Sequence, residues 1–240
     1  MQAMDHILVL LLLVVQPIWG YIESRRDEAR AQAGHDLNRQ RFYRQTAWME
    51  WVFLAALAAV WVFYERPITA LGFVQPGGTG FWIGVGLLIV VLAGLAYSVH
   101  YARHVSESER TKQVASMGAL RKYLPHTRTE LNTFYGLSVT AGVVEEIVYR
   151  GFLFWYLSFV MPLWLVVVAS SVMFGFAHSY QGAGGALRCG LVGLGFGLYY
   201  ALTGSIWLPI IAHALFDILQ GAAIFELLRK DDDGLKPQTA

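Results

Sequence analysis

Seven apolar stretches run through the sequence, and most approach the length of a membrane-spanning helix. They are Met4 to Ile22, Trp48 to Tyr64, Phe81 to Tyr101, Phe134 to Phe159, Leu163 to Ala177, Leu187 to Leu202 and Ile206 to Leu228. About 20 residues of helix cross roughly 30 Å of hydrocarbon. Backbone groups in lipid must be satisfied internally, and these stretches lack the polar alternation of barrel strands. We therefore predict an all-α, polytopic transmembrane helical bundle of about seven helices.

The composition of the chain agrees with a bilayer as its solvent. Hydrophobic residues make up 56% of the 240 residues, and the mean hydropathy is +0.46, above the usage of ordinary soluble proteins. A net charge of +1 gives no case for a nucleic-acid partner, which needs a clustered basic surface. The single cysteine, Cys189, excludes an internal disulfide. The first stretch has neither a basic flank nor a cleavage site, so we expect a retained helix.

Lysine and arginine residues predict how the bundle is oriented. All but two of the 18 fall in connections and a tail on one side: Arg25, Arg26, Arg30, Arg39, Arg41, Arg44, Arg103, Arg110, Lys112, Arg121, Lys122, Arg128, Arg188, Arg229, Lys230 and Lys236. Arg66 falls on the opposite side, and Arg150 lies within the fourth stretch. Cytoplasmic loops collect positive charge. We therefore expect an integral protein of a bacterial cell membrane, with its N-terminus outside and its C-terminus in the cytoplasm.

The segment from Val105 to Leu124 is predicted as an amphipathic cytoplasmic helix. Its apolar residues recur at spacings of three and four: Val114, Met117, Leu120 and Leu124. This spacing gives an apolar face suited to the membrane surface, and Pro125 should end the helix. Thr127 or Thr129 is then expected to cap the next helix.

Three charged residues interrupt the fourth apolar stretch, in the run VVEEIVYRGFLF. Each costs about 2.5 to 3.5 kcal/mol at the centre of a membrane helix, so each needs a partner. Glu146 and Arg150 are four residues apart, so we expect them to pair, either as a structural lock or as part of a site. Glu145 lies about 100° around the helix from Glu146 and is left free to act as a base.

Two later stretches carry further ionisable residues. His178 closes the fifth stretch, and a lone histidine of this kind is usually structural. His213 and Asp217 in the seventh stretch are four apart and project from the same face. Asp217 could orient or charge His213, and a helix-packing hydrogen bond is the plainer alternative. Because three stretches carry such groups, we expect one shared site.

These residues resemble the motifs of the CPBP family, the CAAX-processing and bacteriocin-processing group that includes the type II CAAX prenyl proteases. The motifs are E-E-x-x-x-R at Glu145, Glu146 and Arg150, F-x-x-x-H at Phe174 and His178, and H-x-x-x-D at His213 and Asp217. The resemblance covers Phe134 to Leu228. It divides the chain into three N-terminal spans with charged cytoplasmic connections (1–130), a CPBP-like catalytic core (131–228) and a disordered cytoplasmic tail (229–240).

The resemblance implies an intramembrane endopeptidase that cleaves near the C-terminus of a membrane-associated substrate, for which a CAAX protein is one candidate. The implied roles are water activation by Glu145 and His178, oxyanion stabilisation by His213 and Asp217, and support by Glu146, Arg150 and Phe174. The family's third motif often ends in asparagine. An ionised aspartate cannot donate a hydrogen bond to an oxyanion, so we favour Asp217 as the residue that orients His213.

A zinc ion is the alternative to metal-free catalysis, because three protein ligands and a water form the usual catalytic zinc site. The candidate ligands are Glu145, His178 and His213. The H-E-x-x-H motif is absent, and we favour an enzyme without a cofactor. Its expected partners are the lipid bilayer and a peptide or membrane-protein substrate.

Two non-proteolytic functions also fit the intramembrane charges. Ionisable residues within membrane helices mark the pathways of ion-coupled transporters, although the sequence shows no pair of matching broken halves. A non-catalytic membrane scaffold or an immunity-type protein is the second alternative. The presence of both Glu145 and His178 argues against it.

Overall fold

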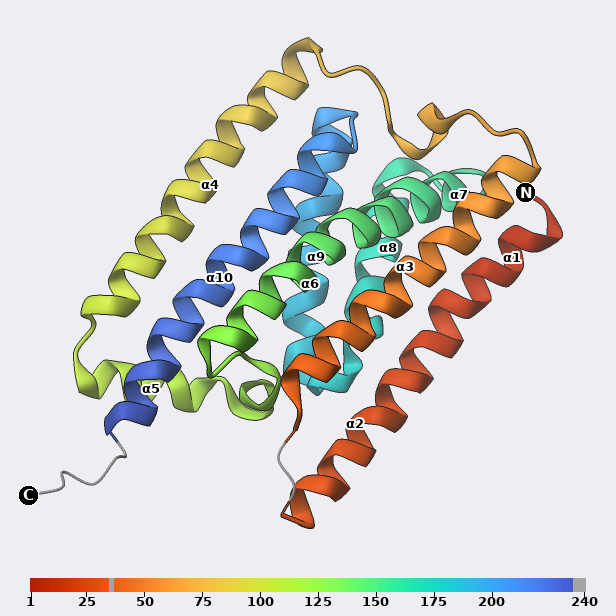
Figure 1. Ribbon diagram of the computed structural model, residues 1–240. Coiled ribbons are helices and arrows are strands. Elements are labelled where there is room, and N and C mark those ends of the chain that lie inside the picture. Colours follow the sequence, from red (N-terminus) through yellow and green to blue (C-terminus); the bar gives the residue numbers. More distant parts are fainter. Residues whose placement is uncertain (35–36, 235–240) are drawn as a thin grey trace, which may run out of the picture.

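The computed structural model describes residues 1–34 and 37–234. All regular secondary structure in these residues is helical, which confirms the predicted all-α class (Figure 1). The α-helices are α1 (Ala3–Leu10), α2 (Gln16–Gln32), α3 (Arg39–Phe63), α4 (Gly78–His104), α5 (Glu107–Ser116), α6 (Arg128–Glu146), α7 (Phe154–Ser158), α8 (Leu163–Ala177), α9 (Ala183–Thr203) and α10 (Trp207–Gly234). Shorter 3-10 or π segments are η1 (Leu11–Val15), η2 (Ile68–Leu71), η3 (Gly118–Tyr123), η4 (Ile147–Leu153) and η5 (Ser179–Gln181).

Length and composition allow five helical segments of the described chain to cross a membrane. They are Ala3–Arg30, Arg39–Phe63, Gly78–His104, Ala183–Thr203 and Trp207–Arg229. α8 is apolar but has only 15 residues, and the fourth predicted stretch is divided among α6, η4 and α7. The polytopic helical bundle is therefore supported, while the number of seven crossings stays a prediction.

The helix ends that adjoin the basic connections gather at one end of the bundle. In Figure 1 the end of α2, the start of α3, the end of α4 with α5, and the end of α10 all lie at the lower end, whereas the connection from α3 to α4 lies at the upper end. α10 continues to Gly234, past the predicted start of the tail at 229. Residues 235–240 of that predicted tail lie outside the described residues.

Arg66, in the connection at the upper end, is held by a bidentate ion pair with Asp5 of α1. Its Nη1 and Nη2 donate to the two carboxylate oxygens at 2.7 and 2.8 Å, and the Asp5 side chain is fully buried. The guanidinium also lies over the rings of Trp61, Tyr64 and Trp155. These contacts explain how Arg66 is stabilised on the side opposite to the other arginines of the connections.

The predicted amphipathic segment forms α5 and η3, but its apolar face packs on protein instead of facing the membrane surface. Val114 and Leu124 are buried in a cluster with Ala102 of α4 and Leu227 and Leu228 of α10. Apolar side chains at the ends of α4 and α10 thus cover the face that was expected to meet lipid.

Thr127 caps α6, as one of the two predicted candidates. Its Oγ1 accepts from the Glu130 backbone N–H at 3.2 Å, and a Glu130 carboxylate oxygen accepts from the Thr127 backbone N–H at 3.0 Å, which together form a capping box. Burial raises the pKa of Glu130, but hydrogen bonds from the His126 and Thr127 N–H groups and the Arg39 guanidinium outweigh burial and lower that pKa. The cap fixes where α6 begins, and so how far along the bundle its later residues lie.

Candidate active site

Gly142 allows α6 and α10 to approach closely one turn before the two glutamates. A Cβ at position 142 would lie 2.6 Å from the Ala214 backbone nitrogen and 2.7 Å from its Cβ. The residue before Ala214 is His213, whose Nδ1 lies 2.7 Å from Glu146 Oε1. The absence of a side chain at Gly142 therefore permits the contact between the first and third motifs.

Replacing Gly142 by alanine should destabilise the protein by about 1 to 3 kcal/mol, because the added methyl overpacks the contact between α6 and α10. The measurement is unfolding in detergent micelles. Gly136→Ala is the matched control, since a Cβ at Gly136, on the same helix, meets nothing within 4 Å. Equal stability of the two variants would show that the close contact is not needed.

The predicted pair of Glu146 and Arg150 is present and buried. Arg150 Nη1 lies 2.8 Å from Glu146 Oε1, and the side chains are 1% and 0% exposed. Arg150 Nη2 donates to the Gly193 carbonyl of α9 at 2.9 Å. Its guanidinium also contacts the rings of Phe174 on α8 and Phe196 on α9. The pair therefore connects α6 with both helices of the neighbouring hairpin.

The helix widens into the π segment η4 directly after Glu146. This segment, Ile147–Leu153, contains Arg150, whereas the sequence predicted one uninterrupted helix. π-Helical turns are rare and often occur at functional sites. Within it, the Tyr149 ring packs edge-on against Phe174 at 5.0 Å, and the Tyr149 hydroxyl is buried with no hydrogen-bond partner among the described residues.

Glu146 fixes the orientation of His213. The Glu146 carboxylate, paired with Arg150, accepts a hydrogen bond from His213 Nδ1–H at 2.7 Å, so the proton is assigned to Nδ1. His213 Nε2 then faces Glu145 Oε2 at 3.8 Å and Asp217 Oδ2 at 3.7 Å. We expected Asp217 to orient His213, but the carboxylate that accepts the hydrogen bond from His213 Nδ1–H is that of Glu146. Asp217 instead lies beside His213 Nε2, the atom that also faces the Glu145 carboxylate.

His178 follows the last residue of α8, and its ring is also fixed through Nδ1. Nδ1–H donates to the Phe174 carbonyl at 2.8 Å, because a carbonyl can only accept. Its Nε2 lies 3.9 Å from Glu145 Oε1. The 15 residues of α8 span about 22 Å, less than the hydrocarbon thickness of a bilayer. This early end explains how His178, just after α8, comes close to Glu145 near the end of α6.

Glu145 lies between the two imidazole rings. Its Oε1 faces His178 and its Oε2 faces His213, and its side chain is 14% exposed. The separations of 3.9 and 3.8 Å are longer than direct hydrogen bonds and suit bridging by a water molecule. The structure thus brings together Glu145, His178, His213 and Asp217 from α6, α8 and α10.

Phe174 lies next to these groups. Its ring centroid is 4.7 Å from that of His178 and 6.2 Å from that of His213, and the Arg150 guanidinium lies 4.9 Å from it. The side chain is only 3% exposed. A single aromatic ring therefore contacts residues of all three predicted motifs.

α3 adds a carboxylate that the sequence analysis missed. Glu50 shares a helix face with the buried Leu57 and Trp61, by its spacing of seven and eleven residues. Its Oε2 is buried and has no hydrogen-bond partner in the described part of the chain. Glu50 also lies within electrostatic range of Glu145 and Asp217. An acidic residue inside an apolar span is a functional candidate by itself, and this signal could have identified Glu50.

Residues 127–219 match the family model described as "Type II CAAX prenyl endopeptidase Rce1-like". The matched segment begins at the cap of α6 and includes every residue of the three motifs, so it confirms the resemblance over this part of the chain. Glu50 and the first five α-helices lie outside it. No curated protein and no solved structure shows a significant match to the chain.

Proposed function

We propose that this chain, which carries a domain of the Rce1-like type II CAAX prenyl endopeptidase family in residues 127–219, is an intramembrane endopeptidase in which Glu145 and His178 activate water. The family match supports intramembrane proteolysis in general. One observation supports the finer assignment: the Glu145 carboxylate lies between His178 Nε2 and His213 Nε2, at 3.9 and 3.8 Å.

Water activation is the first step of the proposed reaction. Glu145 takes a proton from a water molecule that also hydrogen-bonds to His178 Nε2, since the proton on Nδ1 leaves Nε2 as an acceptor. The water oxygen attacks the peptide carbonyl carbon and forms a tetrahedral intermediate with a negatively charged oxygen. The C–N bond then breaks, and Glu145 delivers the proton to the leaving amine.

Oxyanion stabilisation is the proposed task of His213. When its Nε2 is protonated, Nε2–H can donate to the developing oxyanion, while Glu146 keeps hold of Nδ1. Asp217 lies 3.7 Å from the same Nε2 and so can stabilise a positive charge on His213 during the reaction. Arg150 and Phe174 keep Glu146 and the two rings in place.

The proposed substrate is a membrane-associated peptide or protein cleaved near its C-terminus, with a CAAX protein as one candidate. The family description and the bundle of apolar helices support this class. An ion-coupled transporter and a non-catalytic scaffold or immunity-type protein are the competing functions. Neither of these functions produces new peptide termini, so the detection of new termini distinguishes a peptidase from both.

The deciding experiment incubates the detergent-purified chain with a peptide and membrane-protein library and identifies new termini by mass spectrometry. We expect cleavage by the wild type, loss of cleavage in His178→Ala, and full cleavage in His104→Ala, a matched control at the exposed end of α4. Cleavage should persist under strong chelation if, as we propose, no metal takes part. Equal cleavage by all three proteins would refute the role of His178. A transporter would instead give no new termini, and after reconstitution into vesicles it would take up ions in a way that depends on Glu145.

Replacing Glu50 by leucine should raise stability and lower activity. A buried carboxylate oxygen without a partner costs on the order of 1 to 3 kcal/mol, which an apolar side chain of similar size removes. Proteins often keep a locally unfavourable group where their function needs it. Loss of the Glu50 carboxylate, which lies near Glu145 and Asp217, should therefore slow cleavage. Unfolding in detergent and cleavage rates are measured beside Glu109→Leu, which alters a surface glutamate of α5. A less stable Glu50→Leu variant would show that Glu50 supports the fold instead.

A further inference from the structure

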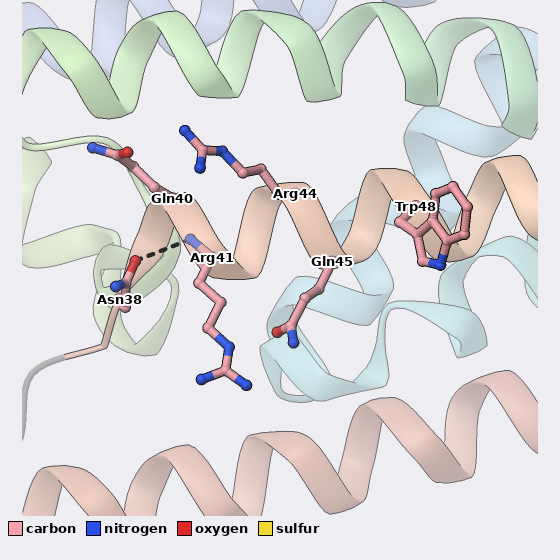
Figure 2. A pocket seen from close by; sticks show the side chains of 6 residues that line it. All are labelled: Asn38, Gln40, Arg41, Arg44, Gln45 and Trp48. Carbon is pink, nitrogen blue, oxygen red and sulfur yellow. Dashed lines mark hydrogen bonds between the residues drawn. The ribbon is translucent and has the colours of Figure 1, made fainter.

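A polar pocket lies at the start of α3, apart from the candidate active site. It has a volume of about 350 Å³ and is lined by Asn38, Gln40, Arg41, Arg44, Gln45 and Trp48. Figure 2 shows Gln40 and Arg44 directed toward the helix above, and Arg41 and Gln45 directed toward the helix below. The pocket therefore presents amides and guanidinium groups on both sides of α3.

Two guanidinium groups of this pocket have no acidic partner within residues 1–34 and 37–234. Neither Arg41 nor Arg44 makes an ion pair with any part of the chain that the structure describes, and none of the lining residues is acidic. Other arginines of the same region are paired, Arg25 with Glu28 and Arg30 with Asp27. The unpaired positive charge makes an anion the favoured ligand of this pocket.

The donor groups suit a phosphate in particular. A guanidinium presents a planar fork that can bind two phosphate oxygens at once. The Asn38 side-chain oxygen accepts from the Arg41 backbone N–H at 3.0 Å, drawn as a dashed line in Figure 2. This bond engages the amide oxygen and leaves the Asn38 NH₂ group as a donor, with Gln40 and Gln45 as further donors.

The pocket also lies at the level expected for lipid headgroups. Trp48 is 70% exposed and stands where the apolar part of α3 begins, and tryptophan is enriched at the boundary between membrane and water. Arg41 and Arg44 precede Trp48 by about 10 and 6 Å along the helix axis, on the polar side of that boundary. Anionic lipids attract basic residues at this depth on the cytoplasmic side, the side predicted here.

We propose that this pocket binds phosphates of anionic membrane lipid headgroups on the two sides of α3, one held by Arg41 and one by Arg44. The ligand contacts α3 before Glu50, so a bound lipid steadies the helix that borders the candidate active site. The proposal stands whether or not the protein is a peptidase, because it depends on the pocket alone.

The test is native mass spectrometry of the full chain released from nanodiscs of mixed phosphatidylglycerol and phosphatidylcholine. The wild type should retain phosphatidylglycerol in preference to phosphatidylcholine. The double variant Arg41→Gln/Arg44→Gln should bind it about thirtyfold more weakly, since each basic residue near the surface contributes about 1 kcal/mol. Arg25→Gln/Arg30→Gln is the matched control, because it removes the same charge from the same region outside the pocket.

Three results would overturn the proposal. Unchanged retention by Arg41→Gln/Arg44→Gln would show that the pocket does not bind the lipid. An equal loss in Arg25→Gln/Arg30→Gln would show that only total charge matters. Displacement of phosphatidylglycerol by soluble glycerol phosphate at similar concentration would identify a soluble phosphate as the ligand. Both arginine pairs are surface groups, so unfolding in detergent should be alike in all three proteins.

Discussion

Replacing Glu145 by glutamine should reduce peptide cleavage by about one hundred- to ten thousand-fold, the range expected for loss of a general base. Glutamine keeps the shape of the side chain but cannot take a proton from water. Glu145 makes its nearest ionic contacts at 3.8 and 3.9 Å, so its loss should leave stability nearly unchanged. The measurement compares initial cleavage rates at equal protein concentration with unfolding in the same detergent.

The control for this substitution is Glu109→Gln, which makes the same chemical change in α5, where Glu109 pairs with Lys112. We expect full activity from the control. A Glu145→Gln protein that cleaves at the wild-type rate would contradict the assignment of Glu145 as the base. A parallel loss of stability would instead assign this carboxylate to the fold.

Replacing Arg150 by methionine should have the largest effect on stability, about 3 to 5 kcal/mol. Methionine fills a similar volume, but it leaves the Glu146 carboxylate buried without its cationic partner and removes the hydrogen bond that Arg150 donates to the Gly193 carbonyl. Denaturant unfolding in mixed micelles measures the loss. Arg188→Met is the matched control, since Arg188 lies exposed on α9 and, among the residues that the structure describes, donates only to the Gly184 carbonyl of its own helix.

A double variant separates stability from activity at the same pair. Glu146→Leu with Arg150→Met removes both charges, so much of the stability lost in the single variant should return. Cleavage should stay low, because His213 Nδ1 no longer has the carboxylate that accepts its hydrogen bond. Recovery of full activity in the double variant would show that Glu146 does not position His213.

The sequence predicted those features that depend on local pattern. The lengths of the apolar stretches indicated the helices, the threonines at positions 127 and 129 indicated the start of α6, and the spacing of Glu146 and Arg150 indicated their ion pair. The three motifs named the residues that meet around Glu145. Each of these depends on residues close together in the chain or on a motif that can be read directly.

Features that depend on contacts between distant helices could not be predicted in the same way. Which carboxylate holds His213 depends on how closely α10 approaches α6 at Gly142, and sequence spacing favoured Asp217 instead. Glu50 joins the site only because α3 packs beside α6. The apolar face of α5 has the same pattern whether lipid or the ends of α4 and α10 cover it.

The π segment after Glu146 makes this part of the fold sensitive to chain length. A π turn accommodates one additional residue, so winding Ile147–Leu153 as ordinary α-helix with the same number of residues would rotate the following helix by about 100°. Glu145 and Glu146 would keep their positions. Trp155 of α7, which now packs edge-on against Trp61 of α3 at 4.9 Å, would turn away from it. The number of residues in this segment therefore matters as much as their identity.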